Sequence, residues 1–201
     1  MPRPRSLTAD RLVTATLAVL DRDGPDALTM RAVAKELGMA TMSLYRYVSD
    51  KDELEVLVVD HVLSAVDLAV PPGDWRERIT EVLTRVREAV VTHTATVPLL
   101  LRHRHAVPAS LVQIEAMLAI LTEAGFTGER RVIAQRTIVA YFLGTLQNEH
   151  FGPLAGAGTA AMAAQERLPL LAETAATARG IGADAEFRGG LEIVLRGLSH
   201  P

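Results

Sequence analysis

Cysteine is absent from the sequence, and aromatic residues are scarce, with one Trp, three Tyr and four Phe. The absence of cysteine excludes disulfide bonds, thiol catalysis and cysteine-ligated zinc, and it fits a reducing cytosol. Aromatic side chains are enriched in strands, whereas the abundant Ala and Leu are strong helix formers. The composition therefore predicts helices packed on helices and a cytoplasmic location.

Long hydrophobic runs are also missing. No apolar stretch approaches the ~20 residues needed to span a membrane, and the segment MPRPRSLTADR lacks the apolar core of a signal peptide. We therefore expect no membrane partner. The net charge of −3 argues against a general polyanion binder. Residues 1–51 nevertheless carry eight Lys or Arg against six Asp or Glu, a local excess that agrees with DNA contact at this end.

Apolar residues at helical spacing, with clear start and stop signals, predict an all-α chain. We expect helices over residues 8–22, 29–38, 41–47, 51–69 and 74–93. A short helical piece is expected between Pro98 and Pro108, and further helices over residues 109–124, 127–150, 167–178 and 184–198. The Gly- and Ala-rich residues 151–164 are typical of a loop. No strand is predicted, because no segment alternates polar and apolar residues over a convincing length.

Residues 28–54, LTMRAVAKELGMATMSLYRYVSDKDEL, have the pattern of a helix-turn-helix. Ala34 is small enough for a second helix to cross nearby, and Gly38 ends the first helix because a left-handed backbone costs glycine little. Leu44 is expected to anchor the second helix to the core. The other residues of 41–47 are Thr, Met, Ser, two Tyr and Arg, an unusual set for packing but a suitable one for a DNA groove.

This segment resembles the DNA-binding part of the tetracycline-repressor (TetR) family of bacterial transcription regulators. The specific signature is LYRYV-x-x-K-x-x-L at residues 44–54, directly behind the helix-turn-helix. Similarity to the drug-binding repressors continues in DW at 74–75, AGFTGERR at 124–131, FLG at 142–144 and FRGGLEIVLRGL at 187–198. The resemblance implies a homodimer with a three-helix DNA-binding head, residues 1–50. A ligand-binding and dimerising body would follow, residues 51–201, beginning with a connecting helix at about 51–69.

The resemblance also implies which residues contact double-stranded operator DNA. Arg46 can donate two hydrogen bonds to guanine, worth about 1–3 kcal/mol of discrimination. Arg31 could reach a base or a phosphate, and Arg3 and Arg5 would form an arm over the minor groove. The remaining assignments are base contacts by Thr41, Met42 and Ser43, and phosphate contacts by Thr29, Tyr45, Tyr47 and Lys51.

Several of these residues have a structural alternative. Tyr45 can cover the small core of the head, and Lys51 can be a solvated residue of a first helical turn. Arg46 can pair with Asp50 one turn later, an exposed ion pair worth at most about 0.5 kcal/mol. The two N-terminal arginines can belong to a tail without DNA contact.

By the same resemblance, residues 127–150 and 184–198 form the dimer interface. Their glycines permit close helix approach, or are ordinary packing positions: Gly144, Gly189, Gly190 and Gly197. An effector in the body would favour a spacing of the two heads that no longer fits the operator. Such coupling is reciprocal, so DNA would weaken effector binding by the same factor.

The positions that match the magnesium–tetracycline contacts of the drug-binding repressors have lost most of their polar chemistry. We therefore expect a small, rather apolar effector, with no metal and no cofactor. The segment RHRH at 102–105 could bind a metal through its two histidines, but it is more typical of a solvated basic turn. The candidate effector contacts are Val82, Val86, Leu100, His103, His105 and Asn148.

An enzyme and a helical dimer without operator binding are the competing interpretations. The sequence has no HExxH motif, no Gly-rich phosphate loop, no recognisable Ser-His-Asp set and no thiol, so we expect no enzyme. A ligand- or partner-binding dimer would keep the body and lack sequence-specific DNA binding. Among regulators, the resemblance favours a repressor over an activator, because blocking polymerase requires only occupancy of the promoter.

Overall fold

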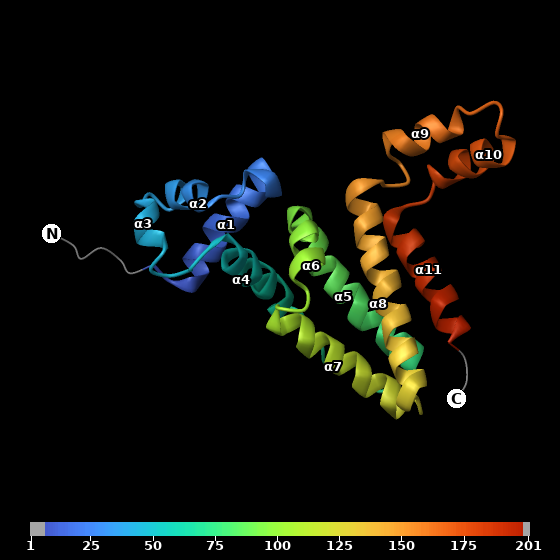
Figure 1. Ribbon diagram of the computed structural model, residues 1–201. Helices are drawn as coiled ribbons and strands as arrows, with labels where there is room; N and C mark the ends of the chain where they lie inside the picture. Colours follow the sequence, from blue (N-terminus) through green and yellow to red (C-terminus); the bar gives the residue numbers. More distant parts are fainter. Residues whose placement is uncertain (1–6, 199–201) are drawn as a thin grey trace. The chain divides into compact units, whose positions relative to one another are not determined.

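The computed structural model describes residues 7–198, and these form eleven α-helices and two short 3₁₀ helices without a strand (Figure 1). This confirms the all-α prediction. The helices divide into two compact units, residues 7–67 with Arg85–Ile114 and Leu68–Thr84 with residues 115–198. This division reflects contacts within the chain. The functional boundary expected near residue 50 stays a prediction.

The first unit contains α1 (Ala9–Asp23), α2 (Met30–Glu36), α3 (Thr41–Leu44) and α4 (Lys51–Ser64). It also contains the 3₁₀ helices Pro25–Ala27 and Thr94–Thr96, the end of α5 (Trp75–Thr92), α6 (Val97–His103) and the start of α7 (Pro108–Glu123). α1 contacts both α2 and α4, and α4 contacts α6. The core is aliphatic, with fully buried side chains that include Leu20, Val33, Leu44, Leu54 and Val58.

Side-chain caps begin three of these helices near the expected positions. Thr8 and Thr29 each accept a hydrogen bond from the backbone amide three residues later, at 3.3 and 3.1 Å. Asp50 Oδ1 accepts from the Glu53 amide at 2.8 Å. Each bond satisfies an amide that has no partner within the first turn. Glu53 Oε2 in turn accepts from the Ser49 amide at 2.6 Å, and this bond lowers the pKa of the Glu53 carboxyl.

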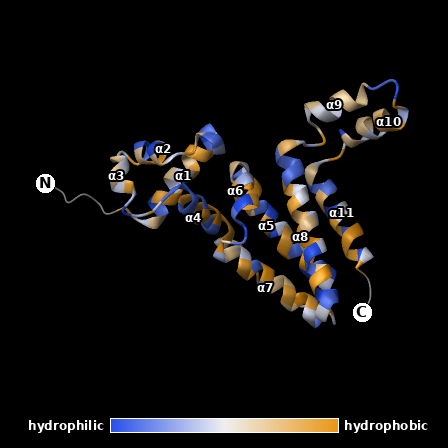
Figure 2. Cartoon of the chain, in the orientation of Figure 1, coloured by the Kyte–Doolittle hydropathy of each residue, from blue (hydrophilic) through white to orange (hydrophobic). Residues whose placement is uncertain are grey.

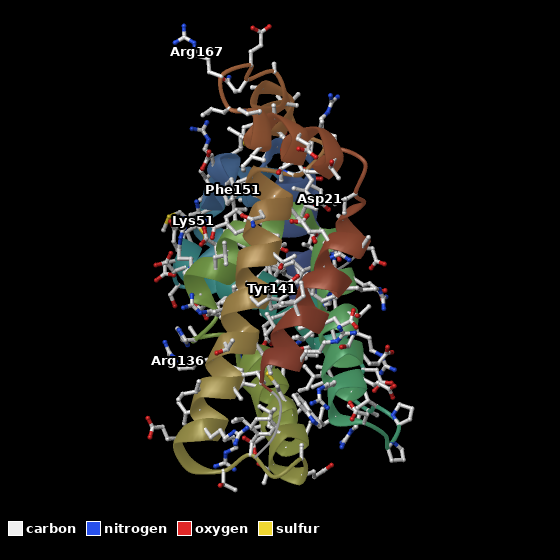
Figure 3. The ribbon with its side chains drawn as sticks, turned by 90° about the vertical axis from the view of Figure 1, so that its right-hand side faces the viewer. Asp21, Lys51, Arg136, Tyr141, Phe151 and Arg167 are labelled. Carbon is white, nitrogen blue, oxygen red and sulfur yellow. The ribbon has the colours of Figure 1, made fainter. Side chains whose placement is uncertain are left out.

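The second unit is built on α8 (Gly128–Phe151) and α11 (Ala183–Gly197), which run side by side (Figure 1). Tyr141 points from α8 toward α11, where its hydroxyl donates to the Phe187 carbonyl oxygen at 2.9 Å (Figure 3). The two rings are stacked with centroids 6.4 Å apart. A Cβ atom at Gly190 would lie 2.2 Å from the Tyr141 hydroxyl oxygen. Glycine is therefore the residue that fits this crossing without displacing the tyrosine.

Three segments differ from the sequence-based expectation. α3 ends at Leu44, with a turn over residues 45–47, and α4 ends at Ser64 instead of near residue 69. The loop expected over residues 151–164 contains a further helix, α9 (Ala157–Ala163), which packs on α10 (Pro169–Ala178). Alanine is the strongest helix former, and its abundance in α9 outweighs the single Gly158.

Hydrophobic residues dominate α7 (Figure 2). Even so, no single helix within residues 7–198 is both long enough and apolar enough to cross a membrane. One bent pair of segments, Thr94–His103 with Pro108–Glu123, meets the requirement by length and composition alone.

Candidate DNA-binding face and effector site

The turn between α2 and α3 is closed by two backbone hydrogen bonds. The Gly38 amide donates to the Lys35 carbonyl at 3.0 Å, and the Met39 amide donates to the Ala34 carbonyl at 2.9 Å. Gly38 has φ +66, a left-handed backbone that lets the chain leave α2 sharply and that glycine adopts without steric cost. Ala34 is buried, and α3 packs on α2. The structural roles expected for Ala34 and Gly38 are confirmed.

Residues 41–47 contain one buried side chain. Leu44 is fully buried, as expected for the residue that anchors the segment. Met42 is 76% exposed, so its apolar surface is available to a partner and contributes little to the core. Tyr45 is 45% exposed, so part of its side chain is accessible to a partner and the rest is covered by the protein. The other side chains are exposed in Arg46 and Tyr47 and half-buried in Thr41 and Ser43.

The remaining DNA candidates lie in the same unit. Thr29 and Arg31 are exposed at the start of α2, and Lys51 is half-buried at the start of α4. Arg46 forms no ion pair with any residue between 7 and 198, so the alternative pairing with Asp50 is not found there. Arg3 and Arg5 lie outside the described residues. The assignment of each residue to a base or a phosphate stays a prediction.

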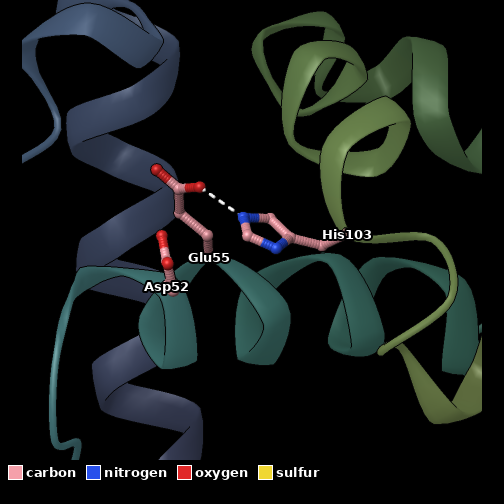
Figure 4. A group of neighbouring side chains, drawn as sticks. All are labelled: Asp52, Glu55 and His103. Atoms are coloured by element: carbon pink, nitrogen blue, oxygen red, sulfur yellow. Dashed lines mark hydrogen bonds and ion pairs between the residues drawn. The ribbon is translucent and has the colours of Figure 1, made fainter.

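A buried carboxylate that the sequence analysis did not single out lies in α4. Glu55 is 0% exposed, and its Oε2 accepts a hydrogen bond from Arg102 Nη1 at 3.0 Å. The same oxygen accepts one from His103 Nε2 at 2.7 Å (Figure 4). Lys51 Nζ lies 3.3 Å from Glu55 Oε1. A buried carboxylate needs such partners, because its charge is costly to remove from water. The interpretation of residues 102–105 as a solvated basic turn is therefore wrong for His103, whose side chain is 12% exposed, whereas Arg102 remains 58% exposed although it also binds Glu55.

Asp52, Glu55 and His103 have ligand atoms within 4.8 Å of one another, a spacing that could hold a metal ion (Figure 4). The charge of Glu55 is already offset by Arg102 and Lys51, which would have to leave before a cation could bind. The group is therefore better described as an ion-pair cluster than as a metal centre.

The six candidate effector contacts are divided between the two units, with Val82 and Asn148 in the second and the others in the first. The three aliphatic members are buried in the core of the protein. His103 is bound to Glu55 and is thereby committed to a contact within the protein. The buried set is Val82, Val86 and Leu100, and the exposed set is His105 and Asn148. Their assignment to an effector site stays a prediction.

A small helical unit in which a glycine turn presents a short, accessible helix defines a helix-turn-helix DNA-binding protein. Residues 12–55 match the family described as bacterial regulatory proteins, tetR family. Residues 69–200 match the family described as tetracyclin repressor-like, C-terminal domain. The chain therefore belongs to the TetR family, whose members regulate transcription, and this confirms the family expected from the sequence.

Individual relatives agree with this assignment. An HTH-type transcriptional regulator of Saccharopolyspora erythraea is 35% identical over 145 residues, covering 71% of this chain and 61% of the relative. The HTH-type transcriptional repressor DrrR1 of Streptomyces coeruleorubidus is 33% identical over 151 residues, covering 74% of this chain and 55% of the relative. The chain thus spans less than two thirds of either protein.

The fold also matches a solved structure over nearly its whole length. The structure of the TetR family protein ActR of Streptomyces coelicolor in complex with actinorhodin has a TM-score of 0.81 and 28% sequence identity. The match covers 97% of this chain and 96% of ActR.

Proposed function

We propose that this protein is a ligand-responsive transcription repressor. It binds a palindromic operator as a homodimer and is released by a small, rather apolar effector. The observation that carries DNA binding is the accessible face of residues 41–47, where exposed Met42 and Arg46 flank the buried Leu44. The major groove, about 12 Å wide, admits a helix of this kind. Repression is supported by the similarity to DrrR1, a repressor.

Each accessible side chain of the face has a matching contact on DNA. Arg46 forms two hydrogen bonds with a guanine edge, and Met42 packs on a thymine methyl group. Thr41 and Ser43 offer hydroxyl groups that accept or donate to neighbouring bases. Phosphate contacts by the surrounding residues then fix the orientation of the helix without adding sequence information. They come from Thr29, Tyr45, Tyr47 and Lys51, with Arg31 at the edge of the base contacts.

A second copy of the chain supplies the second DNA-binding head. Two helix-turn-helix units about 34–36 Å apart meet successive turns of the same groove. Exposed apolar residues on the two long helices of the second unit support an interface there, since Ile133 lies on α8 and Ile193 on α11. The Cβ positions of Gly144 and Gly189 meet no atom within 4 Å in one chain, which leaves room for a partner helix.

The effector is proposed to be apolar because the candidate contacts Val82, Val86 and Leu100 carry no polar group. ActR, which shares the fold, binds actinorhodin, and we use that compound as the first probe. Binding of an effector must oppose operator binding by a single coupling factor in both directions.

Selection of random duplex DNA by the purified protein tests the proposal. We expect a palindrome with half-sites about one helical turn apart. A dimer carries two Arg46 residues and each bidentate contact is worth about 1–3 kcal/mol, so Arg46→Ala should weaken binding to that sequence by at least about 30-fold. Arg167→Ala, the same charge change at an exposed site of the second unit, should bind like the natural protein.

Two outcomes would overturn the proposal. Capture of DNA without sequence preference and with a steep salt dependence would mean that the head does not discriminate sequences. An operator complex that no apolar compound dissociates, starting with actinorhodin, would remove the effector from the proposal and leave the operator contact standing.

A further inference from the structure

The two carboxylate oxygens of Glu55, in the ion-pair cluster of α4 and α6, have different partners. Oε2 of Glu55 accepts hydrogen bonds from both Arg102 and His103, at 3.0 and 2.7 Å. Oε1 accepts no hydrogen bond from residues 7–198, although Lys51 Nζ lies 3.3 Å away. Oε2, which faces α6, is therefore hydrogen-bonded, whereas Oε1 attracts Lys51 by charge without a hydrogen bond.

Lys51 is the more exposed member of the Lys51–Glu55 ion pair. Its side chain is 39% exposed, while that of Glu55 is 0% exposed. Lysine carries its charge on a flexible stem with three rotatable donors, so a short rotation can take Nζ from a carboxylate to a neighbouring anion. Lys51 is also the first residue of α4, directly behind Asp50, the cap of the helix that follows the DNA-binding face.

We propose that Glu55 is a positioning residue that competes with a DNA phosphate for Lys51. The competition is set from α6, because Arg102 offsets part of the negative charge that Glu55 presents to Lys51. This inference rests on the proposed function, in which Lys51 contacts the DNA backbone. When Glu55 pairs more strongly with Arg102 of α6, Lys51 is released to bind the phosphate. When that pairing is weaker, Lys51 stays beside Glu55 Oε1.

The competition predicts that removing the charge of Glu55 raises operator affinity, whereas a purely structural role of Glu55 predicts that it lowers operator affinity. Glu55→Gln keeps the shape of the side chain and removes its charge, so Lys51 becomes free for DNA. We expect operator binding of the dimer to become about 2- to 30-fold tighter, the range for two partly exposed ion pairs. In a Lys51→Ala background the same Glu55→Gln change should leave operator affinity unchanged. A residue that merely holds the fold together would lower affinity in both backgrounds.

A second variant tests the same cluster from α6 and does not touch the buried carboxylate. Arg102→Met removes one partner of Glu55 Oε2, so Glu55 should hold Lys51 more strongly and weaken operator binding, again only when Lys51 is present. Arg104→Met is the matched control, because Arg104 donates to the Leu101 carbonyl oxygen at 2.8 Å and not to Glu55. Arg104→Met removes one positive charge from the same segment, as Arg102→Met does.

The measurement is operator affinity of the full-length dimer across a salt series, with the helical content of each variant checked by circular dichroism. Each dimer carries two Lys51 residues, so Lys51→Ala should reduce the slope of log affinity against log salt by about 1.8, which is about 0.9 for each phosphate contact. If that slope is unchanged while Arg46→Ala still weakens operator binding, the competition is overturned and the proposed function stands. If neither the natural protein nor any variant selects an operator sequence, the proposed function itself fails.

Two further results decide the competition. Equal effects of Glu55→Gln with and without Lys51 would show that Glu55 acts on the fold alone and would overturn the inference. If Glu55→Gln does not fold, Arg102→Met and Arg104→Met carry the test. Equal loss of affinity in those two variants would overturn it as well.

Discussion

Replacing Gly190 with alanine should destabilise the second unit, although alanine is the better helix former. The new Cβ would lie 2.2 Å from the Tyr141 hydroxyl oxygen and 2.8 Å from two ring carbons. Ordinary contact begins at 3.4 Å, so the hydroxyl must retreat by about 1.2 Å. The ring is stacked on Phe187 and cannot make this movement without losing its bond to the Phe187 carbonyl.

The size of the destabilisation follows from two costs and one gain in the free energy of unfolding. Overpacking costs about 1–3 kcal/mol, and the lost hydrogen bond about 1 kcal/mol. Exchange of glycine for alanine inside a helix returns about 1 kcal/mol. We therefore expect Gly190→Ala to lower the free energy of unfolding by about 1–3 kcal/mol, measured by urea denaturation at one fixed protein concentration.

Gly158 provides the control for this experiment. It lies in α9 of the same unit, and a Cβ there meets no atom within 4 Å. Gly158→Ala should therefore raise the free energy of unfolding by up to about 1 kcal/mol. In a Tyr141→Phe background, Gly190→Ala should cost less, because the nearest atom is gone. If Gly190→Ala is as harmless as Gly158→Ala, the described packing of α8 on α11 is refuted.

Two further predictions concern the first unit. Gly38→Ala should cost about 1–2 kcal/mol, since the left-handed backbone at φ +66 is strained for alanine. An unchanged urea midpoint would contradict this, and Gly158→Ala in α9 is the control that should lose no stability. Glu53 has a lowered pKa because its carboxylate accepts from the Ser49 amide, so its stabilising effect is present at neutral pH and lost as the pH falls through its folded-state titration. The natural protein should therefore be more stable than Glu53→Gln near neutral pH, with a difference that disappears in acid; a difference independent of pH would exclude this explanation.

Local signals account for the parts of the fold that the sequence predicts well. Thr29 and Asp50 are caps whose side chains bond to amides three residues on, and Gly38 needs only its own φ to end α2. Such features involve neighbours in the chain, so sequence alone is sufficient to find them. Leu44 was predictable for a related reason, because it is the sole aliphatic residue of a polar segment.

Contacts between distant residues account for what sequence could not predict. Glu55 and His103 are 48 positions apart, and nothing in the sequence near either residue indicates that they meet. The end of α4 at Ser64 was missed because no glycine or proline follows it before Pro71. α9 was missed because alanine and glycine together are ambiguous between helix and loop until packing on α10 decides.

The single anchor of residues 41–47 has a consequence for how this protein can change. Leu44 is the one fully buried side chain of the segment, and Met42 and Arg46 are exposed, so exchanges at Met42 and Arg46 should alter the free energy of unfolding by only about 0.5 kcal/mol each. Folding and DNA preference would then depend on different positions within the same seven residues. Under the proposed function, a head of this design would acquire a new operator by surface substitutions alone, which makes Met42 and Arg46 the first positions to vary in redirecting the protein to another promoter.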